Sequence, residues 1–185
     1  ISPPAACAVA YTLTEDNSVG TDHRIYTTAP ATPTGQLSWS VFMKAGTRTW
    51  GFLRIDRSGG TTPYVWFDLA NGKVGTAETG MTGQIQAVGG GWYRCTATID
   101  NTTGSSHPMI GIATANATYG YTGDNASFIY IAGAHLNAGL PTPYLKTGAT
   151  APLYTAGTPK SQNLASGSAT QSVTVFPGCV YSILH

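Results

Sequence analysis

The feature that most constrains how this chain folds is a two-residue alternation of side chains along short segments. In Gln36–Lys44 one set of alternate positions is apolar and the other is mostly small or polar: Leu37, Trp39, Val41 and Met43 against Ser38, Ser40, Phe42 and Lys44. A period of two places the two sets on opposite faces of a half-buried β-strand. The 3.6-residue period of an amphipathic helix is essentially absent, so we predict an all-β fold.

Turn residues separate seven further strand-like segments: Trp50–Asp56, Tyr64–Leu69, Lys73–Thr76, Gln84–Val88, Trp92–Ile99, Met109–Ala113 and Phe128–Leu136. Asn71-Gly72 is the strongest hairpin signal. Ala8–Thr14 and His23–Tyr26 add two edge strands. Strands of about 5–9 residues with turns roughly every 8–12 predict two antiparallel sheets packed as a sandwich. The predicted core holds Leu37, Trp39, Val41, Leu53, Ile55, Val65, Phe67, Tyr93, Cys95 and Ile129.

The chain divides into three parts by composition. Residues 1–147 form the predicted sandwich, which Pro141 and Pro143 close because proline cannot continue a strand ladder. Residues 148–170 are rich in Thr, Ala, Gly, Pro and Ser and predict a linker. Residues 171–185 predict a short C-terminal hairpin around Pro177-Gly178. Because two strands alone are marginal in water, we expect this hairpin to dock on a neighbour or to begin a truncated module.

Charge excludes some partners. Only 9% of the residues are charged and the net charge is +1, with no Lys/Arg cluster, so we expect no nucleic acid partner. We find no membrane-length apolar run and no signal peptide, and we expect no membrane partner.

The chain does not begin with Met, so we expect a fragment or a processed product. We expect Cys95, on the inward side of its strand, to be a buried free thiol. A disulfide between the other two cysteines, Cys7 and Cys179, is a separate hypothesis that no framework spacing supports.

Catalytic and metal-binding patterns are missing from the sequence. Eight acidic residues leave few paired carboxylates for glycosidase chemistry, and no Gly-x-Ser-x-Gly elbow occurs. The four histidines lack ligand spacing. We therefore predict that the protein is not an enzyme and needs no cofactor. A structural calcium held by backbone carbonyls with Asp16 and Asp124 is the alternative.

Candidate ligand contacts lie on the polar side of the predicted strands: Arg54, Tyr64, Trp66 and Arg94. Aromatic faces stack on sugar C–H surfaces and planar polar groups bind paired hydroxyls, so convergence on one sheet face predicts a glycan site. The alternative interpretation is structural. The rings would pack under a loop, and the arginines would pair with Asp56 or Asp68 across strands.

The glycine-rich segment 119–125 is a second candidate, through Tyr119, Tyr121 and Asp124. Loops at the ends of sandwiches often carry recognition. The alternative is a turn in which Asp124 caps backbone amides. Trp92 follows three glycines, and we expect it to anchor that turn rather than touch a ligand.

Three stretches resemble the jelly-roll modules of bacteriophage tail-fibre, tail-spike and related virion proteins: Ser40–Trp50, Gly91–Cys95 and Ile129–Gly139, with Leu13–Asp16 and His23–Tyr26 resembling their upstream strands. Such modules look like non-catalytic carbohydrate-binding domains. The resemblance implies a jelly-roll sandwich in an extracellular virion. It also implies that the chain forms a homo-oligomer, with a trimer favoured by analogy. Its other implied partners are further virion proteins and a bacterial surface glycan.

Two functions follow as hypotheses. The first is a non-catalytic tail fibre or tail spike domain that binds a host surface glycan. The second is a purely structural virion protein, a head decoration or fibre spacer, that contacts only other subunits. The first predicts that Arg54, Trp66 and Arg94 line an open groove, and the second that an adjacent chain covers them. An accessory carbohydrate module of a bacterial enzyme is a third alternative.

Overall fold

A computed structural model of the chain describes residues 1–26, 34–57, 62–101 and 106–146. The predicted linker, the C-terminal hairpin and Cys179 lie outside these residues. Within them are ten strands: β1 (Tyr11–Thr14), β2 (His23–Tyr26), β3 (Gly35–Ala45), β4 (Trp50–Arg57), β5 (Tyr64–Asp68), β6 (Lys73–Ala77), β7 (Met81–Gly89), β8 (Trp92–Asn101), β9 (Ser106–Ala113) and β10 (Phe128–Ala138). No membrane-spanning helix occurs among the described residues.

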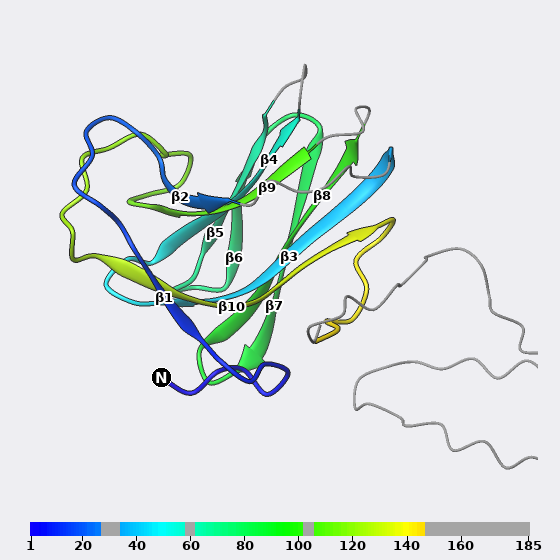
Figure 1. Ribbon diagram of the computed structural model, residues 1–185, viewed down its shortest axis with the longest axis horizontal. Coiled ribbons are helices and arrows are strands. Elements are labelled where there is room, and N and C mark those ends of the chain that lie inside the picture. The colour runs from blue at the N-terminus through cyan, green and yellow to red at the C-terminus, as the bar shows by residue number, and fades with distance from the viewer. Residues whose placement is uncertain (27–33, 58–61, 102–105, 147–185) are drawn as a thin grey trace, which may run out of the picture.

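The strands form two five-stranded antiparallel sheets that lie against each other as two layers (Figure 1). The first sheet has the order β1-β10-β3-β8-β7, and the second has the order β2-β9-β4-β5-β6. The predicted antiparallel β-sandwich is therefore confirmed. β1 and β2 lie at sheet edges, as expected for short N-terminal strands. The Asn71-Gly72 signal also marks a real hairpin, since Asp68 of β5 pairs with Lys73 of β6.

The core between the sheets follows the predicted alternation. Nine of the ten predicted core residues are buried: Leu37, Trp39, Val41, Leu53, Ile55, Val65, Phe67, Cys95 and Ile129. Tyr93 is half-buried and packs against this core. Trp39 is enclosed and its indole Nε1 donates a hydrogen bond to the Met109 carbonyl at 3.3 Å, so its polar atom is satisfied. Cys95 is a buried free thiol, as predicted.

The outer faces of the sheets are also partly covered, which the alternation does not predict. On the first sheet, Phe42, Trp92 and Ala132 form a buried cluster with Cys7 and Tyr144 packed on it. These last two residues belong to the segments before β1 and after β10. The segments just before β1 and just after β10 therefore cover part of the outside of this sheet.

A bulge in β10 makes room for one of these segments. The pairing of β10 with β3 shifts between Ala132 and His135, and Gly133 in between has a φ of +53°. A Cβ atom at Gly133 would lie 2.5 Å from Cys7 Sγ and 3.0 Å from the Phe42 ring. Positive φ and close approach both demand glycine here.

Candidate functional site

Four of the predicted ligand residues come together on the outer face of the second sheet: Arg54, Tyr64, Trp66 and Tyr119. Tyr64 and Trp66 project from β5 and stack with ring centroids 5.1 Å apart and planes 12° apart. Arg54 of β4 is paired directly with Tyr64 across the strands. Tyr119, from the loop between β9 and β10, also stacks on Tyr64, with the ring centroids 4.9 Å apart and the planes 18° apart. The result is a three-ring aromatic stack of Trp66, Tyr64 and Tyr119.

A charged cluster fixes the central ring of this stack. Arg54 Nη1 donates to Tyr64 Oη at 2.8 Å and to Asp22 Oδ2 at 3.0 Å, and Tyr64 Oη donates to Asp22 Oδ2 at 3.2 Å. The Arg54 guanidinium lies 4.9 Å from the Tyr64 ring centroid, and Arg24 also forms an ion pair with Asp22. Burial raises the pKa of Tyr64, and the positive charges of Arg54 and Arg24 oppose this rise.

Exposure differs sharply along the stack. Trp66 is 1% exposed and Tyr64 is 7% exposed, whereas Tyr119 is 47% exposed. The Trp66 indole donates to the Thr118 carbonyl at 3.2 Å, so the loop that carries Tyr119 also covers Trp66. The structural alternative is therefore correct for the packing of Trp66 under a loop. Arg54, however, pairs with Asp22 from the loop before β2, and not with Asp56 or Asp68.

Beside the stack is an open hollow of about 640 Å³. Its lining residues are Thr62, Pro63, Tyr64, Ala77, Glu78, Thr79 and Tyr119. Glu78 Oε2 accepts a hydrogen bond from the Tyr64 backbone amide at 3.0 Å, which leaves Glu78 Oε1 without a hydrogen-bond partner among the described residues. An exposed ring next to hydroxyl and carboxylate oxygens is a surface on which a neutral sugar can stack and donate hydrogen bonds.

Arg94 does not join this group, so the expected convergence of four residues is wrong. It projects from β8 on the outer face of the first sheet, on the opposite side of the sandwich. There its Nη2 donates to Ser40 Oγ at 3.1 Å and to the Thr142 carbonyl. Alternation shows that a side chain points away from the core, but not which of the two sheets carries it.

Tyr121 and Asp124 also lie apart from the stack, in the loop that packs near the end of β1. Tyr121 Oη donates to Glu15 Oε2 at 2.7 Å, and its ring lies 4.5 Å from the His23 ring. Burial and the bond to Glu15 raise the pKa of Tyr121. The loop candidate therefore divides: Tyr119 faces the hollow, and Tyr121 faces the protein.

Asp124 caps its own turn, as the structural alternative predicted. Its Oδ1 accepts from the amides of Ala126 at 2.8 Å and Ser127 at 2.6 Å. These bonds to the ionised form hold the pKa of Asp124 well below its ordinary value. Asp16 likewise accepts from Ser18 and lies 2.8 Å from His23 Nδ1.

No cluster of three metal-binding side chains occurs in the described part of the chain. The carboxylates of Asp16 and Asp124, named for a structural calcium, each bond to their own loop. The calcium alternative stays a prediction.

Sequence reasoning missed the acidic residue that organises this end of the molecule. Glu15 has a fully enclosed carboxylate. It accepts hydrogen bonds from Arg48, from Tyr121 and from the Asp124 amide, which lies 3.1 Å from Oε1. In the sequence, Glu15 stands beside Asp16 after a short strand and looks like an exposed loop residue.

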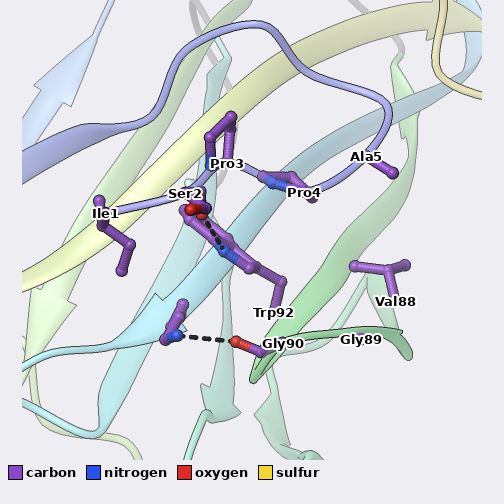
Figure 2. A pocket seen from close by; sticks show the side chains of 10 residues that line it. Ile1, Ser2, Pro3, Pro4, Ala5, Val88, Gly89, Gly90 and Trp92 are labelled. Carbon is purple, nitrogen blue, oxygen red and sulfur yellow. Dashed lines mark hydrogen bonds between the residues drawn. The ribbon is translucent and has the colours of Figure 1, made fainter.

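The glycine turn before Trp92 is held by the N-terminal segment, as Figure 2 shows. Trp92 is 2% exposed, and its indole Nε1 donates to the Ser2 carbonyl at 3.0 Å. Lys44 Nζ donates to the Gly90 carbonyl at 2.7 Å. A hollow of about 410 Å³ lies between this turn and residues 1–5. Trp92 thus has an anchoring environment, in line with the expectation from the sequence.

Comparison of the chain with models of protein families and with curated proteins gives no match.

Proposed function

We propose that this chain is a non-catalytic, carbohydrate-binding jelly-roll domain of a phage virion that attaches to a host surface glycan. The observation that carries the proposal is the half-exposed ring of Tyr119, which extends the Trp66–Tyr64 stack at the rim of the 640 Å³ hollow. The virion setting rests on the resemblance of three sequence stretches to tail-fibre and tail-spike modules.

The physical basis is preorganisation of an aromatic platform. Tyr64 is fixed by Arg54 and Asp22, and it fixes Tyr119 in turn by stacking. A sugar that stacks on Tyr119 would therefore meet a ring whose orientation is already set, so it loses less binding energy to ordering. Trp66 has no free face and supports the stack from beneath.

The residues of the hollow favour a neutral sugar. Glu78 lines it, and the Arg54 guanidinium is engaged by Asp22 and Tyr64. A carboxylate group on the ligand would meet Glu78, whereas hydroxyl groups would donate to it. Because one platform buries few ligand atoms, we expect a dissociation constant of roughly 1 mM per site, with several copies on a fibre supplying avidity.

The test is binding of the chain, displayed at high density on beads, to an array of bacterial surface glycans. Tyr119→Ala should lose binding while its thermal unfolding stays close to wild type. Tyr11→Ala is the matched control, because Tyr11 is an exposed tyrosine, 63% accessible, on an edge strand of the other sheet. No binding by the wild type, or equal binding by Tyr119→Ala, would overturn the proposal.

A second function is favoured by a different observation. Apolar side chains are exposed on the edge strands β1 and β2, with Tyr11 and Tyr26 each 63% exposed and Ile25 44% exposed. Such a side is suited to contacts between subunits, as in a fibre spacer or head decoration. Solvent exposure of Trp66 does not distinguish the glycan-binding function from the structural one, because a loop of the same chain covers this side chain.

The structural function has its own test. Sedimentation of the chain should give an oligomer that Tyr11→Ser and Ile25→Ser together dissociate. If that oligomer forms and no glycan on the array is bound, the structural virion role replaces the adhesin role.

A further inference from the structure

The outer face of the first sheet carries a positive charge without a carboxylate partner. Arg94 is half-buried, and no ion pair joins it to any residue in the described part of the chain. Its contacts are neutral: Ser40 Oγ and the Thr142 carbonyl, both bonded to Nη2. Even partial removal of an unpaired guanidinium from water is costly, so the enclosed part of this group calls for a partner of opposite charge.

Unsatisfied polar atoms gather around this arginine. The described residues contain four enclosed side-chain nitrogen or oxygen atoms without a hydrogen-bond partner, and three of them are Arg94 Nε, His135 Nδ1 and Thr142 Oγ1. Burial lowers the pKa of the His135 imidazole, and the nearby charge of Arg94 lowers it further. Native proteins leave few such atoms, so three of them beside one arginine call for an explanation, such as a bound group that completes their hydrogen bonds.

An open hollow of about 550 Å³ leads to the same guanidinium. Its lining residues are Val74, Gln84, Ile85, Gln86, Arg94, Thr96 and Pro141, and none of them is acidic. Arg94 Nη1 makes no hydrogen bond to the described residues and is not among the enclosed atoms, so it is free to donate into the hollow. The amides of Gln84 and Gln86 are exposed beside it.

We propose that this hollow binds a hexuronate sugar, with the ligand carboxylate on Arg94 and its hydroxyl groups on Gln84, Gln86 and Thr96. A guanidinium matches a carboxylate in charge and in planar geometry. Amide and hydroxyl side chains both donate and accept, as sugar hydroxyls require. This acidic-sugar site is on the opposite sheet from the Tyr119 hollow and does not depend on it.

The structural explanation of Arg94 is that it only holds the segment after β10 through the Thr142 carbonyl. An experiment has to separate the two roles. We would follow backbone amide and imidazole signals of the whole chain by NMR while adding sodium glucuronate. Glucose is the neutral control, and sodium acetate at equal ionic strength tests the carboxylate alone.

Glucuronate should shift the amides of Gln84, Gln86 and Arg94 saturably, while glucose should leave them unmoved and acetate should shift them more weakly. The bound carboxylate should also raise the pH at which the His135 imidazole titrates, because it offsets the charge of Arg94. A merely structural arginine would not produce that change. Tyr119→Ala should bind glucuronate like the wild type, so this result is independent of the glycan proposal above.

Variants complete the test. Gln84→Ala with Gln86→Ala leaves Arg94 and the Thr142 contact in place, and it should weaken glucuronate binding about tenfold with unchanged thermal unfolding. Arg94→Lys keeps the charge but not the planar fork, and it should weaken binding similarly. Equal shifts with glucose, no saturation with glucuronate, or unchanged affinity in the double glutamine variant would overturn the proposal, whether or not Arg94 variants fold.

Discussion

Arg48 binds the enclosed carboxylate of Glu15 with two parallel hydrogen bonds, Nε to Oε2 at 3.1 Å and Nη2 to Oε1 at 2.7 Å. Glu15 follows β1, and Arg48 lies in the turn between β3 and β4. The Tyr121 hydroxyl bonds to the same carboxylate, and the guanidinium lies 5.6 Å from the Tyr121 ring centroid. One buried acid therefore joins three separate segments at this end of the sandwich.

Removing one partner of this pair should destabilise the protein strongly. Arg48→Met leaves the Glu15 carboxylate enclosed with its charge uncompensated, and we expect a loss of about 3–5 kcal/mol in the free energy of unfolding. Urea denaturation measures it. Lys73→Met is the control, because Lys73 is an exposed cation on β6, and it should change stability by less than about 0.5 kcal/mol. A similar small loss for both variants would contradict the structural role of the pair.

Truncation of the central core tryptophan should be equally costly. Trp39 is 6% exposed and contributes to the main apolar cluster from the middle of β3. Trp39→Ala should cost about 3–5 kcal/mol through lost burial and a residual cavity. Tyr11→Ala on an edge strand removes an exposed ring and serves as the comparison. If both variants unfold at the same urea concentration, Trp39 does not belong to the core.

A pair of glycine variants separates strain from crowding. Gly133 and Gly139 both have positive φ, +53° and +82°, so alanine strains the backbone at either position. Only Gly133 has neighbours within reach of a Cβ atom, the nearest being Cys7 Sγ. We expect Gly133→Ala to lose roughly 1–3 kcal/mol more than Gly139→Ala, the cost of overpacking a filled site. Equal losses would show that the N-terminal segment does not pack on the bulge.

The pH dependence of stability should contain a component from His135. Burial and the nearby Arg94 charge lower the pKa of this imidazole in the folded protein, and the Tyr144 ring lies edge-on to it with the centroids 6.1 Å apart. As the pH falls, the unfolded chain therefore takes up the proton first, from an ordinary pKa of about 6.5. Stability should therefore fall over the interval from about pH 7 down through that ordinary pKa.

His135→Gln removes that component, so its stability should depend less on pH over the same interval. Asp124 contributes to stability in a different pH range. Hydrogen bonds within its turn lower the pKa of its carboxyl group, so the stabilisation it gives is lost only as the pH falls below about 4. Thermal unfolding across pH 4–8 separates the two effects. Parallel curves for wild type and His135→Gln would remove the assignment to His135.

Much of the fold can be predicted from the local alternation of apolar and polar side chains, whereas the candidate site depends on packing between segments far apart in the sequence. Trp39 and Phe67 are buried as their parity requires, because each strand has one face toward the core. The same parity places Trp66 and Arg94 on outer faces of the sandwich. It does not show which of the two sheets carries each side chain, or which loop covers that face. Trp66 is enclosed by a loop some 50 positions later, and Asp22, the partner of Arg54, lies 32 positions earlier. No spacing within a strand signals either contact.

Because both faces of β3 are covered, the backbone amide hydrogens of this strand should exchange slowly with solvent. Leu37 to Met43 are all buried. Four of these residues face the second sheet, and three point outward, where Phe42 lies under Cys7 and Tyr144. Amide protons of this strand can meet water only when several layers separate together, so they should report the global opening of the domain. The amides of β1, at a sheet edge, should exchange through local fraying long before that event.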